Sequence, residues 1–253
     1  MLPYNYHTHT ARCNHATGTD KEYVENAIQA GVKVLGFSDH APYLFPNTDY
    51  YSTFRMKTDE LFDYAESVRA LQKEYAKDIR ILLGFELEYY PAFHAEEMKF
   101  LSQVNPDYYI LGQHFGGNEI NDVYAPYTDD ETTFQAYIAQ VIEGLKTGDF
   151  TYLAHPDLAG YRYSKAVYEA QYKKLCEAAK ALDIPLEINL LGLRTNRHYP
   201  DRRLFEIASQ VGNKIVFGVD AHAPDHFQHK ESVETAMQMV KELNLQLIDK
   251  PFL

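Results

Sequence analysis

The sequence predicts an α/β fold, an incomplete (β/α) barrel built as a single domain over residues 1–253. Apolar, β-rich segments alternate along the chain with amphipathic helical segments, which favours a parallel sheet covered by helices. The length of 253 residues, of which 45% are hydrophobic, is near that of one α/β barrel and allows a substantial core. The predicted strands also end in polar, metal-ligating side chains, as expected at the functional edge of such folds.

Seven segments have the apolar, β-branched or aromatic composition of strands. They are Leu2–His7, Val32–Phe37, Ile79–Phe85, Tyr108–Gly112, Phe150–Ala154, Pro185–Ile188 and Lys214–Val219. The first helix begins with a capping-box pattern at Thr19–Glu22 and ends at Gly31. Later helices are predicted at Thr58–Leu71, His94–Ser102, Glu131–Lys146, Ser164–Leu182 and Glu231–Leu243. The Pro- and Tyr-rich segment 41–54 is a long loop, an insert that we expect over the active site.

The composition restricts the partners and the compartment. A net charge of −12 argues against a nucleic-acid backbone binder, which needs a basic face, but it permits a small phosphorylated ligand. The N-terminus lacks the pattern of a signal peptide, and no segment approaches the ~20 apolar residues of a membrane span. Cys13 and Cys176 are too few for a disulfide framework, which favours the cytoplasm. Cys13 is either a thiolate ligand or a small semi-buried residue.

Histidines gather at the ends of the predicted strands. His7 and His9 alternate along an extended segment, so their side chains share a face and can bind one ion together. Of the eleven histidines, seven lie at or just past strand ends: His7, His9, His15, His40, His114, His155 and His222. With Glu86 and Asp220 they form a predicted set of nine ligands, enough for two or three zinc-type ions. Imidazole and carboxylate ligands suit Zn, Mn or Fe.

Other acidic residues and histidines have less definite roles. Glu86 and Glu88 share a strand face, so spacing alone does not choose between them. Asp39 is predicted to orient a metal-bound imidazole. Four further histidines are predicted surface residues, with an exception expected for the one just after the seventh strand, His226. The four are His94, His198, His226 and His229.

The charge of such a site points to a phosphate substrate. Three divalent ions and two carboxylates leave about +4 in the pocket, which attracts phosphate. The ions also lower the pKa of bound water from about 15.7 toward ~7, so that a hydroxide bridging the metals can attack phosphorus in line. Guanidinium groups at the same edge are candidate phosphate ligands because they form bidentate hydrogen bonds. These substrate-binding candidates are Arg162 after the fifth strand, and Arg194 and Arg197 after the sixth.

The order of these motifs resembles that of the PHP (polymerase and histidinol phosphatase) family. The motifs are His7-Thr8-His9, His15, Asp39-His40, Gly84-x-Glu86, His114, His155-Pro156 and Gly218-x-Asp220-Ala221-His222. The resemblance covers nearly the whole chain, from Tyr6 to His222. It implies a distorted (β/α)7 TIM-like barrel with a centre of three divalent metal ions.

The resemblance also implies which ligands share an ion. The first ion would be held by His7, His9, Glu86 and Asp220, and the second by His15, His40 and His222. Glu86, as a bridge, would join His114 and His155 on the third ion. The choice of Glu86 over Glu88 rests on the family likeness. Asp220, on the bridging hydroxide, is the candidate proton acceptor, and His222 is the second candidate catalytic residue.

The size of the chain and the long insert after Asp39-His40 resemble the stand-alone histidinol-phosphatase branch of the family. That likeness implies hydrolysis of L-histidinol phosphate to L-histidinol and phosphate, a step of histidine biosynthesis. The partner would then be a small phosphorylated substrate, with no role for nucleic acid or a membrane. Aromatic residues of the insert either cover this substrate or only pack against one another. They are Tyr43, Phe45, Tyr50 and Tyr51.

Four other functions fit parts of the pattern. Relatives of this family cleave other phosphoesters, such as nucleotides or other small-molecule phosphates. A phosphodiesterase or nuclease needs a basic groove, which a net charge of −12 does not predict. A metal-dependent amidohydrolase also has a His-x-His on its first strand, but it commonly uses a lysine at a strand end, and none is found there. A non-catalytic metal-binding protein would keep the ligands without turnover.

Overall fold

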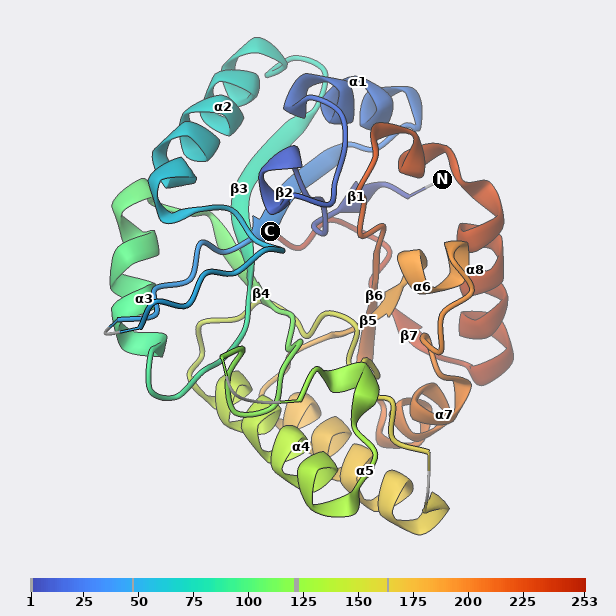
Figure 1. Ribbon diagram of the computed structural model, residues 1–253. Helices are drawn as coiled ribbons and strands as arrows, with labels where there is room; N and C mark the ends of the chain where they lie inside the picture. Colours follow the sequence, from blue (N-terminus) through green and yellow to red (C-terminus); the bar gives the residue numbers. More distant parts are fainter. Residues whose placement is uncertain (1, 47, 121–122, 163) are drawn as a thin grey trace.

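Parallel strands curl around the centre of the molecule in the computed structural model (Figure 1). The structure describes residues 2–46, 48–120, 123–162 and 164–253, so position 47 of the predicted insert and position 1 of the predicted domain lie outside it. One section of the sheet has the order β1-β2-β3-β4 and the other has the order β5-β6-β7. The strands are β1 (Tyr4–Asn5), β2 (Val34–His40), β3 (Arg80–Leu87), β4 (Tyr108–Leu111), β5 (Leu186–Asn189), β6 (Lys214–Gly218) and β7 (Gln246–Leu247).

Short backbone contacts connect the two sections. Leu153, between the sections, forms isolated parallel bridges with Leu111 of β4 and Leu186 of β5. Elsewhere on the curl, Thr8 just after β1 pairs with Ala221 just after β6, and the N–H of His9 donates to the carbonyl of Ala221 at 2.9 Å. The predicted α/β class, with one domain and a curled parallel sheet, is therefore confirmed.

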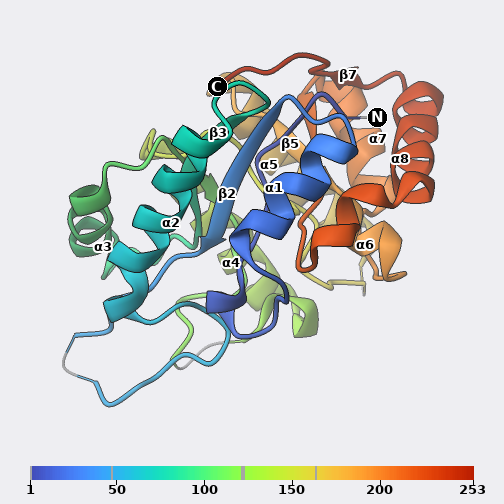
Figure 2. The same cartoon turned by 90° about the horizontal axis from the view of Figure 1, so that it is seen from above.

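Helices lie outside the curled sheet (Figures 1 and 2). They are α1 (Asp20–Gln29), α2 (Leu61–Glu74), α3 (His94–Leu101), α4 (Glu131–Lys146), α5 (Lys165–Ala181), α6 (Leu190–Arg194), α7 (Arg202–Val211) and α8 (Lys230–Leu243). The predicted capping box starts α1, because Thr19 and Glu22 each accept a hydrogen bond from the other's backbone N–H. Among the described residues, no helix has both the length and the apolar character needed to cross a bilayer.

Two apolar clusters fill the molecule. The larger cluster lies between the sheet and the helices and includes Phe37, Phe85, Val68 and Leu175. The smaller one comes from the alternate side chains of the strands, and Phe252 of the C-terminal tail packs against it. Its members are Tyr4, Tyr6, Val34, Leu82, Tyr108, Ile110, Tyr152, Ala154 and Val216. Figure 1 shows the C-terminus at the centre of the curl, so this cluster and the tail close the interior beneath the site.

Several elements differ from the sequence prediction. Strand β1 has only two residues where a strand over Leu2–His7 was expected, and the short helix α6 was not predicted. The predicted strand Phe150–Ala154 forms only isolated bridges, because Pro185 beside it has no N–H to donate and the chain turns sharply at His155. Helix α7 was not predicted, although Asp201 caps its start and Gly212 ends it in a left-handed conformation. Strand β7 has only two residues, too few to show a periodic pattern.

Candidate metal centre

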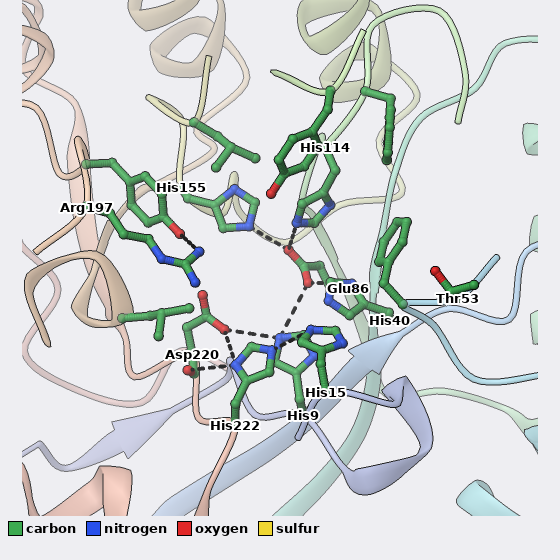
Figure 3. Close-up of a pocket in the computed structure, with 16 residues that line it drawn as sticks. His9, His15, His40, Thr53, Glu86, His114, His155, Arg197, Asp220 and His222 are labelled. Carbon is green, nitrogen blue, oxygen red and sulfur yellow. Dashed lines mark hydrogen bonds and ion pairs between the residues drawn. The ribbon is translucent and has the colours of Figure 1, made fainter. Parts of the chain in front are cut away.

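The predicted ligands meet in one pocket at the carboxyl ends of the strands (Figure 3). The pocket has a volume of about 630 Å³. Eight of the nine ligands line it: His9, His15, His40, Glu86, His114, His155, Asp220 and His222. The ninth, His7, is fully buried, and its Nε2 atom lies 3.5 Å from Glu86 Oε2. The fold therefore brings together all nine residues that the sequence singled out as ligands.

Two of these residues have an unusual backbone conformation. His155 has a φ of 28° and Asp220 has a φ of 49°, both in the left-handed region that side chains rarely adopt. Such a conformation costs of order 1–3 kcal/mol and persists only where the surrounding structure holds it. Both residues directly follow strand-like segments, so the turn directs each side chain into the pocket.

Glycines make room for the buried carboxylates. A Cβ atom on Gly112 would lie 1.9 Å from Glu86 Oε1, and a Cβ atom on Gly218 would lie 1.6 Å from Glu187 Oε1. No side chain fits at either position unless the carboxylate moves. Both glycines are therefore required by the close approach of a carboxylate to a neighbouring strand.

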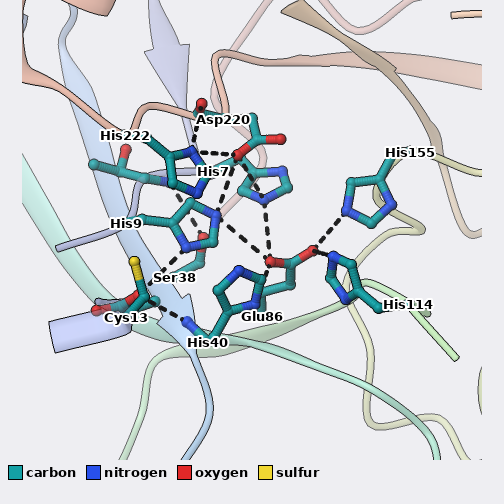
Figure 4. Close-up of polar contacts among 12 residues, drawn as sticks. His7, His9, Cys13, Ser38, His40, Glu86, His114, His155, Asp220 and His222 are labelled. Carbon is teal, nitrogen blue, oxygen red and sulfur yellow. Dashed lines mark hydrogen bonds and ion pairs between the residues drawn. The ribbon is translucent and has the colours of Figure 1, made fainter. Parts of the chain in front are cut away.

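Glu86 lies at the centre of the histidines (Figure 4). Its Oε1 atom is 2.7 Å from His155 Nε2 and 3.7 Å from His114 Nε2. Its Oε2 atom is 3.0 Å from His40 Nδ1 and 3.5 Å from His9 Nε2. A carboxylate with different imidazoles at its two oxygens has the arrangement expected of a bridge between two ions.

Several buried atoms of the predicted ligands have no hydrogen-bond partner among the described residues, and four of them face one another. They are His7 Nε2, His9 Nε2, Glu86 Oε2 and Asp220 Oδ1. Asp220 Oδ1 lies 3.2 Å from His9 Nε2 and 3.7 Å from His7 Nε2. Because buried polar atoms are costly when unpaired, a cluster of converging donor atoms fits a cation that would satisfy all four. The nitrogen and oxygen donors suit a zinc-type ion.

The remaining ligands form two neighbouring groups. His15 Nε2 and His222 Nε2 are 3.0 Å apart, and the ring of His40 lies 5.3 Å from that of His15. His114 and His155 approach Glu86 Oε1 from the other side, with their rings 5.0 Å apart. The family resemblance assigns these two groups to a second and a third ion, an assignment that stays a prediction.

Most of the histidine rings are held through Nδ1, which leaves Nε2 facing the pocket. His7 Nδ1 lies 2.8 Å from Glu187 Oε1, and His114 Nδ1 lies 2.9 Å from Glu88 Oε1. The remaining contacts join His9 to Asp39, His15 to the carbonyl of Cys13, and His222 to the carbonyl of Asp220. Metal-binding histidines are usually oriented by such a hydrogen bond from the other ring nitrogen. Glu88 and Asp39 therefore support ligand rings, while Glu86 lies among them.

The histidines keep both pocket carboxylates ionised. Burial raises the pKa of Glu86, but the imidazoles of His40, His114 and His7 outweigh it and hold the pKa well below its ordinary value. His7 and His222 lower the pKa of Asp220 in the same way against its burial. Burial lowers the pKa of His9, but the adjacent carboxylates of Asp220 and Asp39 raise it to about 9. The two carboxylates are therefore negatively charged, as cation ligands must be.

The three candidate arginines occupy different places. Arg197 lines the pocket, and its Nη1 donates to the hydroxyl of Tyr199 at 2.8 Å (Figure 3). The guanidinium of Arg194 donates to the carbonyls of Val219 and Asp220, at 3.2 and 3.1 Å, so it supports the backbone that carries the ligand Asp220. Arg162 is exposed and lines a separate cavity of about 290 Å³. Of the three, Arg197 therefore shares the pocket with the predicted metal ligands.

Apolar side chains form the rest of the pocket. Phe54 comes from the insert, Phe115 follows β4, and Tyr124 pairs with Phe115 in an antiparallel bridge. We call these three residues the aromatic wall. Their rings are in contact, with centroids 5.9 Å apart for Phe54 and Phe115 and 5.4 Å apart for Phe115 and Tyr124. The insert thus reaches the pocket through Thr53 and Phe54, and the aromatic residues singled out earlier in the loop are not among the pocket lining.

Several residues differ from their predicted environment. Cys13 is fully buried beside Asp39, and burial raises the pKa of its thiol. His94 was predicted at the surface but is buried, with Nε2 2.7 Å from Asp149 Oδ2. His226, the expected exception, is half-buried and accepts a hydrogen bond from Arg194. Glu187 was not singled out, although an acidic residue inside the apolar strand segment Pro185–Ile188 was a usable signal.

The chain is similar to proteins of one family and to histidinol-phosphatases within it. The PHP domain family matches residues 5–190 of the chain. A probable histidinol-phosphatase of Deinococcus radiodurans is 31% identical over 234 residues, which cover 86% of this chain and 85% of the relative. The histidinol-phosphatase of Bacillus subtilis is 26% identical over 249 residues, which cover 85% and 92%. A crystal structure of histidinol phosphate phosphatase from Lactococcus lactis, complexed with Zn, L-histidinol and phosphate, has a TM-score of 0.72 at 21% identity, covers 98% and 96% of the two chains, and shows the same fold.

Proposed function

Because the chain belongs to the PHP family, we propose that it is a metal-dependent phosphomonoesterase that hydrolyses L-histidinol phosphate to L-histidinol and phosphate. The observation that carries the proposal is the cluster of unpartnered buried ligand atoms around Glu86 and Asp220, in a pocket shared with Arg197. The relatives from Deinococcus radiodurans and Bacillus subtilis, which are called histidinol-phosphatases, support the choice of substrate.

The proposed centre holds three divalent ions, Zn, Mn or Fe. His7, His9, Glu86 and Asp220 would hold the first, because their unpartnered atoms converge. His15, His40 and His222 would hold the second, and Glu86 would join His114 and His155 on the third. The backbone contacts at Leu153 and at Thr8 support the related proposal that the curled sheet is a distorted (β/α)7 barrel.

Different side chains of the pocket would have different roles in the hydrolysis of a phosphate ester. When bound, the ions supply positive charge for the phosphate and activate water as a nucleophile near neutral pH. Asp220 would accept the proton of the attacking water, and His222 would help to keep that carboxylate ionised, since its Nδ1 lies 3.2 Å from Asp220 Oδ1. Arg197, held by Tyr199, would bind the phosphate oxygens and orient the ester for in-line attack.

The aromatic part of the pocket suits an organic leaving group. The aromatic wall presents ring faces and edges, on which a flat imidazole can stack. Thr53 and Phe54 come from the insert 41–54, so we propose that this segment covers the substrate and limits the access of water. The net charge of −12 fits a small phosphorylated ligand better than a nucleic acid.

Phosphate release from L-histidinol phosphate tests the proposal. The protein would be loaded with Zn or Mn and assayed beside nucleotides, sugar phosphates and an aryl phosphate, with a chelated sample as control. A metal-dependent kcat/KM at least about a hundredfold above that for the panel is expected, because a site that binds the leaving group discriminates strongly. Comparable or higher rates on another phosphoester would keep the phosphatase and reject this substrate.

Replacing Arg197 with alanine should raise KM for the ester by roughly ten- to a hundredfold, with a smaller effect on kcat. The variant loses charge-assisted hydrogen bonds to the ground-state phosphate, which are worth about 1.5–3 kcal/mol. Steady-state kinetics measure both constants. Arg69→Ala is the matched control, because Arg69 pairs with Asp107 on the outside of the molecule. An unchanged KM in the Arg197 variant would contradict the assigned role.

A further inference from the structure

A fully buried arginine lies behind the pocket. Arg55, directly after the insert, is only 2% exposed, although arginine is rarely buried without charged partners. Its guanidinium donates to both carboxylate oxygens of Glu88, at 3.0 Å each, and to Glu119 Oε2 at 2.6 Å. It also donates to the carbonyl of Ala41 at 3.0 Å, at the start of the insert. A single side chain therefore joins the two ends of the insert to two other segments.

Glu88 extends this contact to a metal ligand. Its Oε1 atom accepts hydrogen bonds from Arg55 and from His114 Nδ1, the latter at 2.9 Å. The same ring has its Nε2 atom 3.7 Å from Glu86 Oε1, inside the pocket. The position of Arg55 is thus linked through one carboxylate to the orientation of His114.

Glu119 extends the contact to the aromatic wall. It lies in the loop that starts with Phe115 and leads to Tyr124, and it is 5% exposed. Arg55 also lies over the ring of Phe54, with its guanidinium carbon 4.5 Å from the ring centroid. Both loops that supply the wall are therefore fastened to the same guanidinium.

We propose that Arg55 is a positioning residue that couples the aromatic wall to the metal ligand His114, an inference that rests on the proposed phosphatase function. Through Glu119 it holds the wall where the leaving group binds, and through Glu88 it holds His114 in the orientation that faces Glu86. The planar guanidinium is needed because it reaches two carboxylates in fixed directions, which the single ammonium of lysine does not do. The contact through Glu119 affects substrate binding, and the contact through Glu88 affects metal binding. Substitutions can therefore separate the two effects.

Two substitutions separate the effect on metal binding from the effect on substrate binding. Arg55→Lys should lower the affinity for one equivalent of metal by about 10–100-fold, the usual effect of losing a partner that orients a ligand ring. Glu119→Ala should leave metal retention unchanged and raise KM for L-histidinol phosphate roughly tenfold, the size of a lost apolar contact in a substrate pocket. Its effect on inhibition by inorganic phosphate should be less than about twofold, because the proposed phosphate ligands are Arg197 and the metal ions, not the aromatic wall.

The measurements are metal content after dialysis against graded chelator, steady-state kinetics and a thermal melt for each variant. Glu119→Gln, which keeps an acceptor for Arg55, should recover most of the KM. Arg69→Lys is the control, because Arg69 joins Asp107 to the carbonyl of Asn105 away from the pocket. If Arg55→Lys does not fold, the variants Glu119→Ala and Glu119→Gln still test whether Arg55 positions the aromatic wall.

Two outcomes would overturn the inference. One is normal metal retention in a folded Arg55→Lys variant. The other is a Glu119→Ala variant that loses thermal stability but keeps the wild-type KM, which a merely structural contact would give. A wild-type protein without phosphatase activity would reject the proposed function instead, and metal retention in Arg55→Lys would still decide the link to His114.

Discussion

Asp220→Asn is expected to lower kcat by about a thousandfold or more, which corresponds to roughly 4 kcal/mol. The substitution keeps the shape of the side chain but removes its negative charge. Asp220 Oδ1 faces the Nε2 atoms of His7 and His9 and has no hydrogen-bond partner among the described residues. The variant therefore loses both a ligand charge and the proposed proton acceptor.

Rate and metal content must be measured together in this variant. At saturating metal, the loss of the proton acceptor alone should still keep kcat far below that of the wild type. Asn189 donates to Asp220 Oδ2 at 3.0 Å, so the amide of the variant must be checked for a flipped orientation by a structure. Wild-type kcat with a full metal load would contradict the role given to Asp220.

The sequence was sufficient to predict that these nine side chains meet, because the carboxyl ends of parallel strands lie at one edge of the sheet. The predicted ligands lie at or shortly after the ends of strands or strand-like segments, so predicting strand ends also predicts which side chains meet, as with His40 at the end of β2 and Glu86 near the end of β3. The pairing of Glu86 with the pocket and Glu88 with His114 could not be derived in this way, since both lie on one strand face. In the structure Glu86 faces the histidines of the pocket, whereas Glu88 accepts hydrogen bonds from Arg55 and from His114 Nδ1.

The parts that were not predicted depend on contacts between distant segments. Glu187 is 180 residues from His7, whose ring it orients, and nothing in the local pattern indicates that pairing. The aromatic wall forms because two loops meet, and its residues are Phe54, Phe115 and Tyr124. Loops lack the periodic pattern of apolar residues from which helices and strands are predicted, so their contacts could not be predicted. Helix α7 is a different case, because its cap and its apolar positions were present in the sequence.

Removal of the metal ions from the wild-type protein should abolish phosphate release and lower the melting temperature. At free metal a hundred times above Kd, one bound ion stabilises the folded state by about 2.7 kcal/mol. For a chain of this size, 1 kcal/mol corresponds to about 2–4 °C, so loss of a single ion should lower Tm by roughly 5–10 °C. Several ions should have a larger effect.

The physical reason is the set of buried atoms that only a cation satisfies. Without ions, the carboxylates of Glu86 and Asp220 and the imidazoles of His7 and His9 stay buried with converging atoms unpaired. Calorimetry of chelated and reloaded samples measures the shift, and recovery of both Tm and activity on adding Zn or Mn excludes damage by the chelator. A chelated protein that keeps its Tm and its turnover would contradict the metal centre, because these side chains would then be stable and active by themselves.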